Sequence, residues 1–101
     1  MTDVWFLRQA LADLRAAHSW YEEQRPGLGD EFADVVDAAV ESIIAFPAAR
    51  PVVYRETRRL LGERFPYCLY YRIHGDQALI VVACLHVALD PRRHQSRLRG
   101  G

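Results

Sequence analysis

The hydrophobic pattern of this chain changes its period from helical to strand-like between residues 46 and 52, and this change constrains the fold more than any other feature. Before it, apolar residues recur every three to four positions, as in amphipathic helices. After it, they alternate or run continuously, as in strands. A chain of 101 residues is long enough for one domain with one modest core. We therefore expect a layer of helices packed on a sheet.

The N-terminal half predicts a short strand followed by two helices. Residues 4–7 form an apolar run typical of a strand, and a helical stripe continues to Tyr21. The sequence Arg-Pro-Gly-Leu-Gly at residues 25–29 interrupts this helix. The second helix begins with acidic residues at 30 and 31 and ends before Pro47, because proline restricts the residue that precedes it. Because only about five residues, 25–29, connect the two helices, we expect them to form an antiparallel hairpin.

The C-terminal half predicts three strands. The first covers residues 52–57, and a turn around Gly62 leads to the second, over residues 67–73. Residues 74–77 supply a tight turn, and residues 78–85 are apolar on both faces, which is typical of a strand in the middle of a sheet. The expected fold class is α+β, in the order strand, helix, helix and three strands. The helical hairpin should pack on one face of a small antiparallel sheet.

The start of the chain and its cysteines exclude several classes of protein. The first residues include an acid and soon reach Arg8, unlike a signal peptide, and the longest apolar run is far shorter than the ~18–20 residues of a membrane span. We therefore expect a cytoplasmic protein that contacts no membrane. Cys68 and Cys84 lack metal-ligand spacing, and whether they share a face depends on the strand register. Reduced packing cysteines, no metal and no organic cofactor are expected.

Charge is distributed unevenly along the chain although its formal net value is zero. Residues 1–46 contain nine acids and three arginines, net −6, whereas residues 47–101 contain four acids and ten arginines, net +6. There is no lysine, and guanidinium groups suit bidentate recognition of phosphate or carboxylate. The alternative is that these arginines are only solvated. The residues expected to bind an anionic target are Arg55, Arg58, Arg59, Arg64, Arg92 and Arg93.

Three stretches, in this order, resemble the RelE/ParE toxin superfamily of bacterial toxin–antitoxin, or plasmid-stabilisation, modules. Residues 20–32 (Trp-Tyr-Glu-Glu-Gln-Arg-Pro-Gly-Leu-Gly-Asp-Glu-Phe) resemble its helix-hairpin signature, and residues 64–72 resemble its Arg-Phe-Pro-Tyr strand. Residues 86–93 resemble its closing His and Asp-Pro element. The resemblance implies a single toxin domain over residues 1–94. Residues 95–101 are then expected to form a flexible basic tail.

Members of this superfamily divide into two mechanisms. ParE-like toxins bind DNA gyrase, whereas RelE-like toxins are ribosome-dependent endoribonucleases that cleave mRNA. The Gly-Leu-Gly and Arg-Phe-Pro-Tyr elements resemble the ParE side, and the absence of lysine also weighs against the RelE side, whose active sites typically contain it. The resemblance thus implies a growth-inhibiting toxin that binds DNA gyrase and is neutralised by a cognate antitoxin.

Two alternatives remain at this point. A RelE-like nuclease acting on mRNA at the ribosome would use His86 as its general acid, because histidine titrates near neutral pH. Its other candidate residues are Arg55, Arg58, Arg64, Glu56 and Glu63. A degenerate toxin would only bind its antitoxin. Residues 87–89 lack the arginine that the family often has there, and His94 stands where a tryptophan is common.

Overall fold

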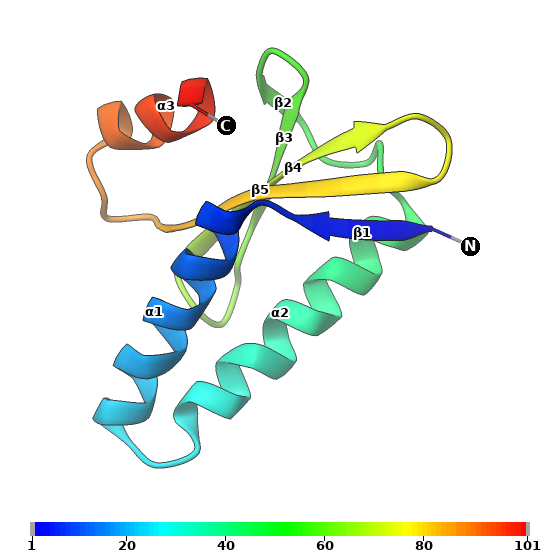
Figure 1. Cartoon of the computed structure of the whole chain (residues 1–101). Coiled ribbons are helices and arrows are strands. Elements are labelled where there is room, and N and C mark those ends of the chain that lie inside the picture. The colour runs from blue at the N-terminus through cyan, green and yellow to red at the C-terminus, as the bar shows by residue number, and fades with distance from the viewer. Residues whose placement is uncertain (1, 101) are drawn as a thin grey trace.

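The structure, a computed structural model, describes residues 2–100. Figure 1 shows one twisted sheet with two long helices on one side and a short C-terminal helix on the other. The elements are β1 (Asp3–Phe6), α1 (Arg8–Gln24), α2 (Leu28–Ala45), β2 (Val52–Tyr54), β3 (Thr57–Leu61), β4 (Tyr67–His74), β5 (Ala78–His86) and α3 (Pro91–Gly100). The predicted α+β class and the helical hairpin are confirmed.

The sheet has the strand order β1-β5-β4-β3-β2. Strands β2 to β5 are antiparallel neighbours, but β1 pairs in parallel with β5, so the sheet is mixed where a wholly antiparallel one was expected. Alternation in a sequence shows which residues share a face, not the direction in which a strand runs. With β1 on one side and β4 on the other, β5 is an interior strand, which explains why it is apolar on both faces.

The single strand expected over residues 52–57 is wrong, because the chain reverses within it. β2 and β3 form a short hairpin in which Tyr54 is paired with Thr57, so Arg55 and Glu56 make the turn. Arg55 adopts a left-handed conformation with φ of 50°. Glycine, asparagine and aspartate are the residues that usually mark such a turn. Since none is present here, the pattern did not show the reversal, and four strands follow the helices instead of three.

The C-terminal residues differ from the flexible tail that was expected. Residues 91–100 form α3, whose first turn is capped by Asp90, since its carboxylate accepts the N–H of Arg92 at 2.8 Å. Leu98 is buried against the sheet. A ten-residue helix with one buried leucine shows almost no hydrophobic period, so this packing was not visible in the sequence. Gly101, the last residue of the expected tail, lies outside the described residues.

The two faces of the sheet pack against different elements. We call the face under α1 and α2 the hairpin face and the opposite one the α3 face. On the hairpin face, Tyr21, Phe32 and Phe65 form an aromatic cluster, with ring centroids of Tyr21 and Phe65 4.7 Å apart. On the α3 face, the smaller cluster includes Tyr70 and Leu98. The domain therefore has a large core on one side of the sheet and a small one on the other.

The two cysteines lie on opposite faces of the sheet. Cys84 is paired with Leu69 and belongs to the hairpin-face cluster, whereas Cys68 is paired with Leu85 and belongs to the α3-face cluster. Both are buried and free, as predicted. Burial raises the pKa of the Cys84 thiol to about 12, so this group stays protonated and unreactive at physiological pH.

The Gly-Leu-Gly sequence builds the turn between the two helices. Gly27 has a φ of 88°, which favours glycine, and a Cβ on Gly29 would meet the carbonyl oxygen of His18 at 2.7 Å. The carboxylate of Glu22 accepts the N–H groups of Gly27 and Gly29 at 2.9 and 3.0 Å. This part of the family resemblance is therefore architectural, because these residues shape the hairpin itself.

Candidate functional site

A groove of about 340 Å³ lies between α3 and the sheet. Its rim includes three exposed apolar side chains from three different segments, Val53, Leu61 and Val87. Arg59 and Tyr70 line the groove from the sheet, and His94 and Gln95 line it from α3. We call this the α3 groove. Only Arg59 of its residues was expected to bind a target, because the groove forms only when α3 folds back onto the sheet.

A tyrosine–histidine pair closes one side of the α3 groove. The side chain of His94 contacts the hydroxyl of Tyr70 through Nδ1 at 2.7 Å and the carbonyl oxygen of His86 through Nε2 at 3.0 Å. A carbonyl only accepts, so Nε2 must donate, and in the neutral ring Nδ1 accepts the Tyr70 proton. Burial, reinforced by the neighbouring Cys68, raises the pKa of Tyr70 to about 12, although Arg59 opposes the shift. Both ring nitrogens of His94 are thus engaged in holding α3.

A second polar contact holds α3 against α1. The carboxylate of Asp13 accepts two hydrogen bonds from the guanidinium of Arg97, at 3.0 and 2.7 Å. The same carboxylate accepts the backbone N–H of Cys84 at 3.0 Å. β1 ends at Phe6, which is paired with Val81, so the edge of β5 beyond that point has no neighbouring strand. Asp13 therefore accepts a hydrogen bond from an N–H group of β5 that has no strand partner, and it also anchors α3 through Arg97.

Three of the arginines expected to bind a target, Arg55, Arg58 and Arg64, do not line the α3 groove, and each lies in a different part of the chain. Arg58 donates to the carbonyl oxygens of Ala48 and Arg50, at 3.2 and 2.6 Å, and so ties β3 to the loop after α2. Arg64 forms an ion pair with Glu31 at the start of α2. Arg55, in the β2–β3 turn, stacks over the ring of Tyr54 at 5.2 Å.

The ion pairs of Glu31 connect the turn between the helices with the β3–β4 loop. Arg64 and Arg25 both bind this carboxylate, Arg25 at 2.7 Å. Their hydrogen bonds, that of Arg64 first, lower the pKa of Glu31. Because Arg64 and Arg25 are committed to an acid of the same chain, the geometry gives them a structural role.

The remaining expected arginines gather on or near α3. Arg59 lines the α3 groove. Its neighbour in β3, Arg58, faces the other side of the sheet, because consecutive residues of a strand point to opposite faces. Arg92 pairs with Asp90 at 3.3 Å, and the hydrogen bonds from Arg92 lower the pKa of that carboxyl. Arg93 lines a second cavity of about 300 Å³ between α3 and the end of β5.

The residues named for a nuclease do not form a connected set. His86 ends β5, where its Nδ1 accepts the N–H of Ala88 at 3.0 Å and its ring packs edge-on against Tyr67. Glu56 and Glu63 are exposed, one in the β2–β3 turn and the other in the β3–β4 loop. Within residues 2–100, no hydrogen bond or ion pair joins His86 to either glutamate or to Arg55, Arg58 or Arg64.

The described part of the chain offers neither a metal cluster nor a membrane span. Among residues 2–100, no group of three or more His, Cys, Asp or Glu side chains has the arrangement to hold a metal ion. The helices described there include none with the length and apolarity to cross a bilayer.

Comparisons with known proteins identify the family. Residues 4–91 match the family described as "ParE toxin of type II toxin-antitoxin system, parDE". A solved structure described as "Chromosomal ParDE TA system from P. aeruginosa" has a TM-score of 0.73 and 24% identity, over 86% of this chain and 97% of that one. The isolated E. coli RelE toxin has a TM-score of 0.65 and 12% identity, with both chains fully covered.

At these identities the two structures establish the shared fold alone. No curated protein gave a significant match to the chain. The resemblance to the RelE/ParE superfamily is confirmed, on its ParE side. Since the family match extends over residues 4–91 of 101, the chain belongs to the ParE toxins of type II toxin–antitoxin systems.

Proposed function

We propose that this ParE toxin inhibits growth by binding DNA gyrase in the cytoplasm, and that a cognate antitoxin neutralises it. The observation that carries the proposal is the ParE family match over residues 4–91. Inhibition by binding needs a stable surface and no catalytic set. The geometry is consistent with that, because no hydrogen bond or ion pair within residues 2–100 joins the candidate acid His86 to the glutamates and arginines named with it.

The polar groups around the α3 groove also support binding over catalysis. General acid–base chemistry requires a titrating nitrogen within hydrogen-bond reach of the substrate. Both nitrogens of His94 are already bonded within the chain, and Tyr70 donates its proton to that ring. These residues shape the groove and keep α3 in place.

The α3 groove is the surface that we assign to the antitoxin. Its exposed rim residues Val53, Leu61 and Val87 would cover apolar side chains of a bound segment. Arg59 at the groove favours a carboxylate on that segment, because a guanidinium binds it bidentately. The partner we propose is therefore an antitoxin segment with apolar residues and an acidic residue that meets Arg59. An antitoxin partner also agrees with the similar P. aeruginosa structure, which is described as a ParDE toxin–antitoxin system.

Inducible expression in bacteria tests the main proposal. Growth should stop, and gyrase-linked cleaved DNA should accumulate in cells. Purified toxin should block supercoiling by purified gyrase, while primer extension shows intact transcripts. Cut transcripts with unaffected gyrase would contradict the proposal and support the ribonuclease. A folded toxin without any growth effect would instead indicate a chain that only binds its antitoxin.

A matched pair of variants tests the groove assignment. Leu61→Glu places a charge on the groove rim, and Val52→Glu places the same charge on an exposed residue of β2 that does not line the groove. Leu61→Glu should keep gyrase inhibition and weaken antitoxin binding by about one order of magnitude or more, measured by calorimetry, since a buried charge without a partner is costly. Val52→Glu should leave both unchanged. Equal antitoxin affinity for the two variants would place the antitoxin elsewhere.

A further inference from the structure

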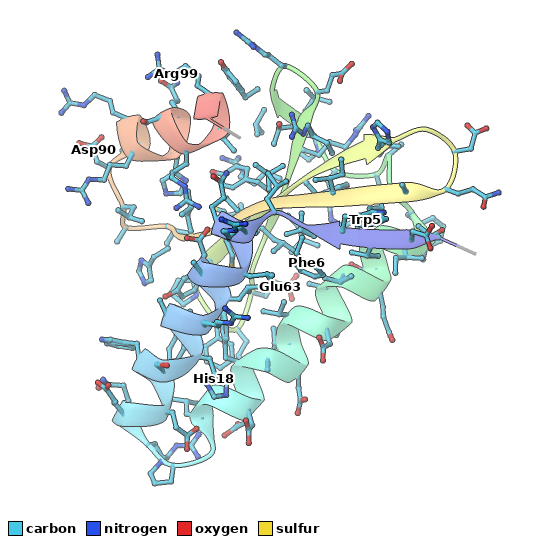
Figure 2. The ribbon with its side chains drawn as sticks, in the orientation of Figure 1. Trp5, Phe6, His18, Glu63, Asp90 and Arg99 are labelled. Carbon is cyan, nitrogen blue, oxygen red and sulfur yellow. The ribbon has the colours of Figure 1, made fainter. Side chains whose placement is uncertain are left out.

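The outer face of α3 is strongly basic. The helix contains Arg92, Arg93, Arg97 and Arg99 and no acidic residue. Arg97 turns inward to Asp13, whereas the other three are exposed. Figure 2 shows Arg99 on the side of α3 that points away from α1. Ser96 is also exposed between these arginines, so this face presents hydrogen-bond donors and no apolar side chain, whereas Gln95 lines the α3 groove.

The exposed arginines of α3 are largely free of partners in the described chain. Arg93 and Arg99 form no ion pair with residues 2–100, although the charge of Arg93 helps to lower the pKa of Asp90, and Arg92 pairs with Asp90, with 90% of its own side chain exposed. This distinguishes them from Arg25 and Arg64, whose charge is balanced by Glu31. The positive charge of α3 is thus available to an external ligand.

The acidic surface of the molecule lies on the far side of the sheet. Asp30, Asp34, Asp37 and Glu41 recur at helical spacing along α2, and all four are exposed. α2 and α3 cover opposite faces of the sheet (Figure 1). Two layers of packing at about 10 Å each separate them, which exceeds the Debye length of about 8 Å at physiological salt. An anionic ligand on α3 would hence be little affected by the acids of α2.

We propose that the outer face of α3 binds the phosphate backbone of duplex DNA. This inference rests on the proposed function, because a toxin bound to gyrase would lie next to the DNA that gyrase holds. Arginine and serine side chains are typical phosphate contacts, whereas a protein interface is centred on apolar and aromatic residues, which this face lacks. Residues 92–99 extend over about 10 Å of helix, which corresponds to about three phosphates of one strand.

Direct binding to DNA is measured without gyrase. The probe is a fluorescein-labelled 20-bp duplex of arbitrary sequence, and anisotropy is followed from 20 to 200 mM salt. Each phosphate contact contributes about 0.9 to the slope of log affinity against log salt. Arg99→Gln should therefore weaken binding about tenfold at 50 mM salt, and Arg93→Gln/Arg99→Gln should lower the slope by about 2. Arg15→Gln, an exposed arginine of α1, is the matched control and should change neither.

The outcomes separate this inference from the proposed function. Absence of wild-type binding to the duplex at 20 mM salt, or equal binding by Arg99→Gln and Arg15→Gln, would overturn the inference. Reduced DNA binding of the double variant, with a higher toxin concentration needed to accumulate cleaved gyrase complexes, would support it. If the wild type binds DNA through α3 but never affects gyrase, the proposed target fails while the DNA surface stands.

Discussion

The hairpin face and the α3 face of the sheet are covered by helices to different extents. On the hairpin face, two helices of 17 and 18 residues cover the sheet, and the rings of Tyr21, Phe32 and Phe65 pack against one another. On the α3 face, a ten-residue helix is held by one buried leucine and two polar contacts, and a groove remains open beside it. We infer that the first face supplies most of the stability and the second supplies the surfaces for recognition.

The largest effect should come from the hairpin face. Phe32→Ala removes a ring that is 2% exposed, and large-to-small changes of this kind cost about 3–5 kcal/mol of unfolding free energy. Phe46→Ala makes the same chemical change at a side chain that is 69% exposed, so it should stay within about 0.5 kcal/mol of the wild type. Urea unfolding followed by circular dichroism measures both. If both variants lost the same unfolding free energy, the burial of Phe32 would not explain its contribution to stability.

An intermediate effect is expected where α3 is anchored to α1. Asp13→Asn leaves Arg97 without its charge partner and weakens the acceptor of the Cys84 N–H, at a cost of about 1–3 kcal/mol. Hydrogen exchange should become faster in α3 than in α1 or α2. The control is Asp34→Asn, an exposed acid of α2, which should change neither quantity. Uniform acceleration across the chain would show that the two faces unfold together.

The burial of Tyr70, whose hydroxyl also contacts His94, predicts a smaller, pH-dependent effect. The pKa of Tyr70 is about 12 in the folded chain and about 10 when unfolded, so its contribution is complete below pH 10 and is lost as the pH rises toward 12. Tyr70→Phe should cost about 1 kcal/mol at pH 8. The urea midpoint of the wild type should then fall more steeply above pH 10 than that of Tyr70→Phe. Parallel curves would contradict the assigned burial of this phenol.

The smallest effect belongs to the ion pairs of Glu31. Its pKa is lowered in the folded chain, so the stabilisation is present above the unfolded value near 4.5 and is lost as the pH falls through the folded value. Glu31→Gln should slightly lower the melting temperature at pH 7, and its difference from the wild type should shrink as the pH is lowered below 4.5. Exposed pairs of this type contribute little, and high salt should reduce the difference. A difference that does not change with pH would indicate packing and not charge.

The helical hairpin could be predicted from the sequence in detail. Its two apolar stripes, the turn at Gly27 and the end before Pro47 are local patterns, and the structure reproduces them within a few residues. The β2–β3 hairpin and α3 could not be predicted, because Arg55 takes a turn conformation usually marked by glycine and because α3 buries only Leu98. The α3 groove was missed for the same reason, since it lies between those two elements.

The sequence by itself determined the α+β class, the hairpin, the interior position of β5 and the uneven charge, because each depends on residue type and spacing along the chain. The tertiary structure alone decided that β1 runs parallel to β5, that the two cysteines lie on opposite faces and that Asp13 meets Arg97 across 84 positions. It also decided which arginines are paired with acids and which stay available on α3. Strand direction and partner choice arise from contacts between distant segments, and local periodicity contains no information about them.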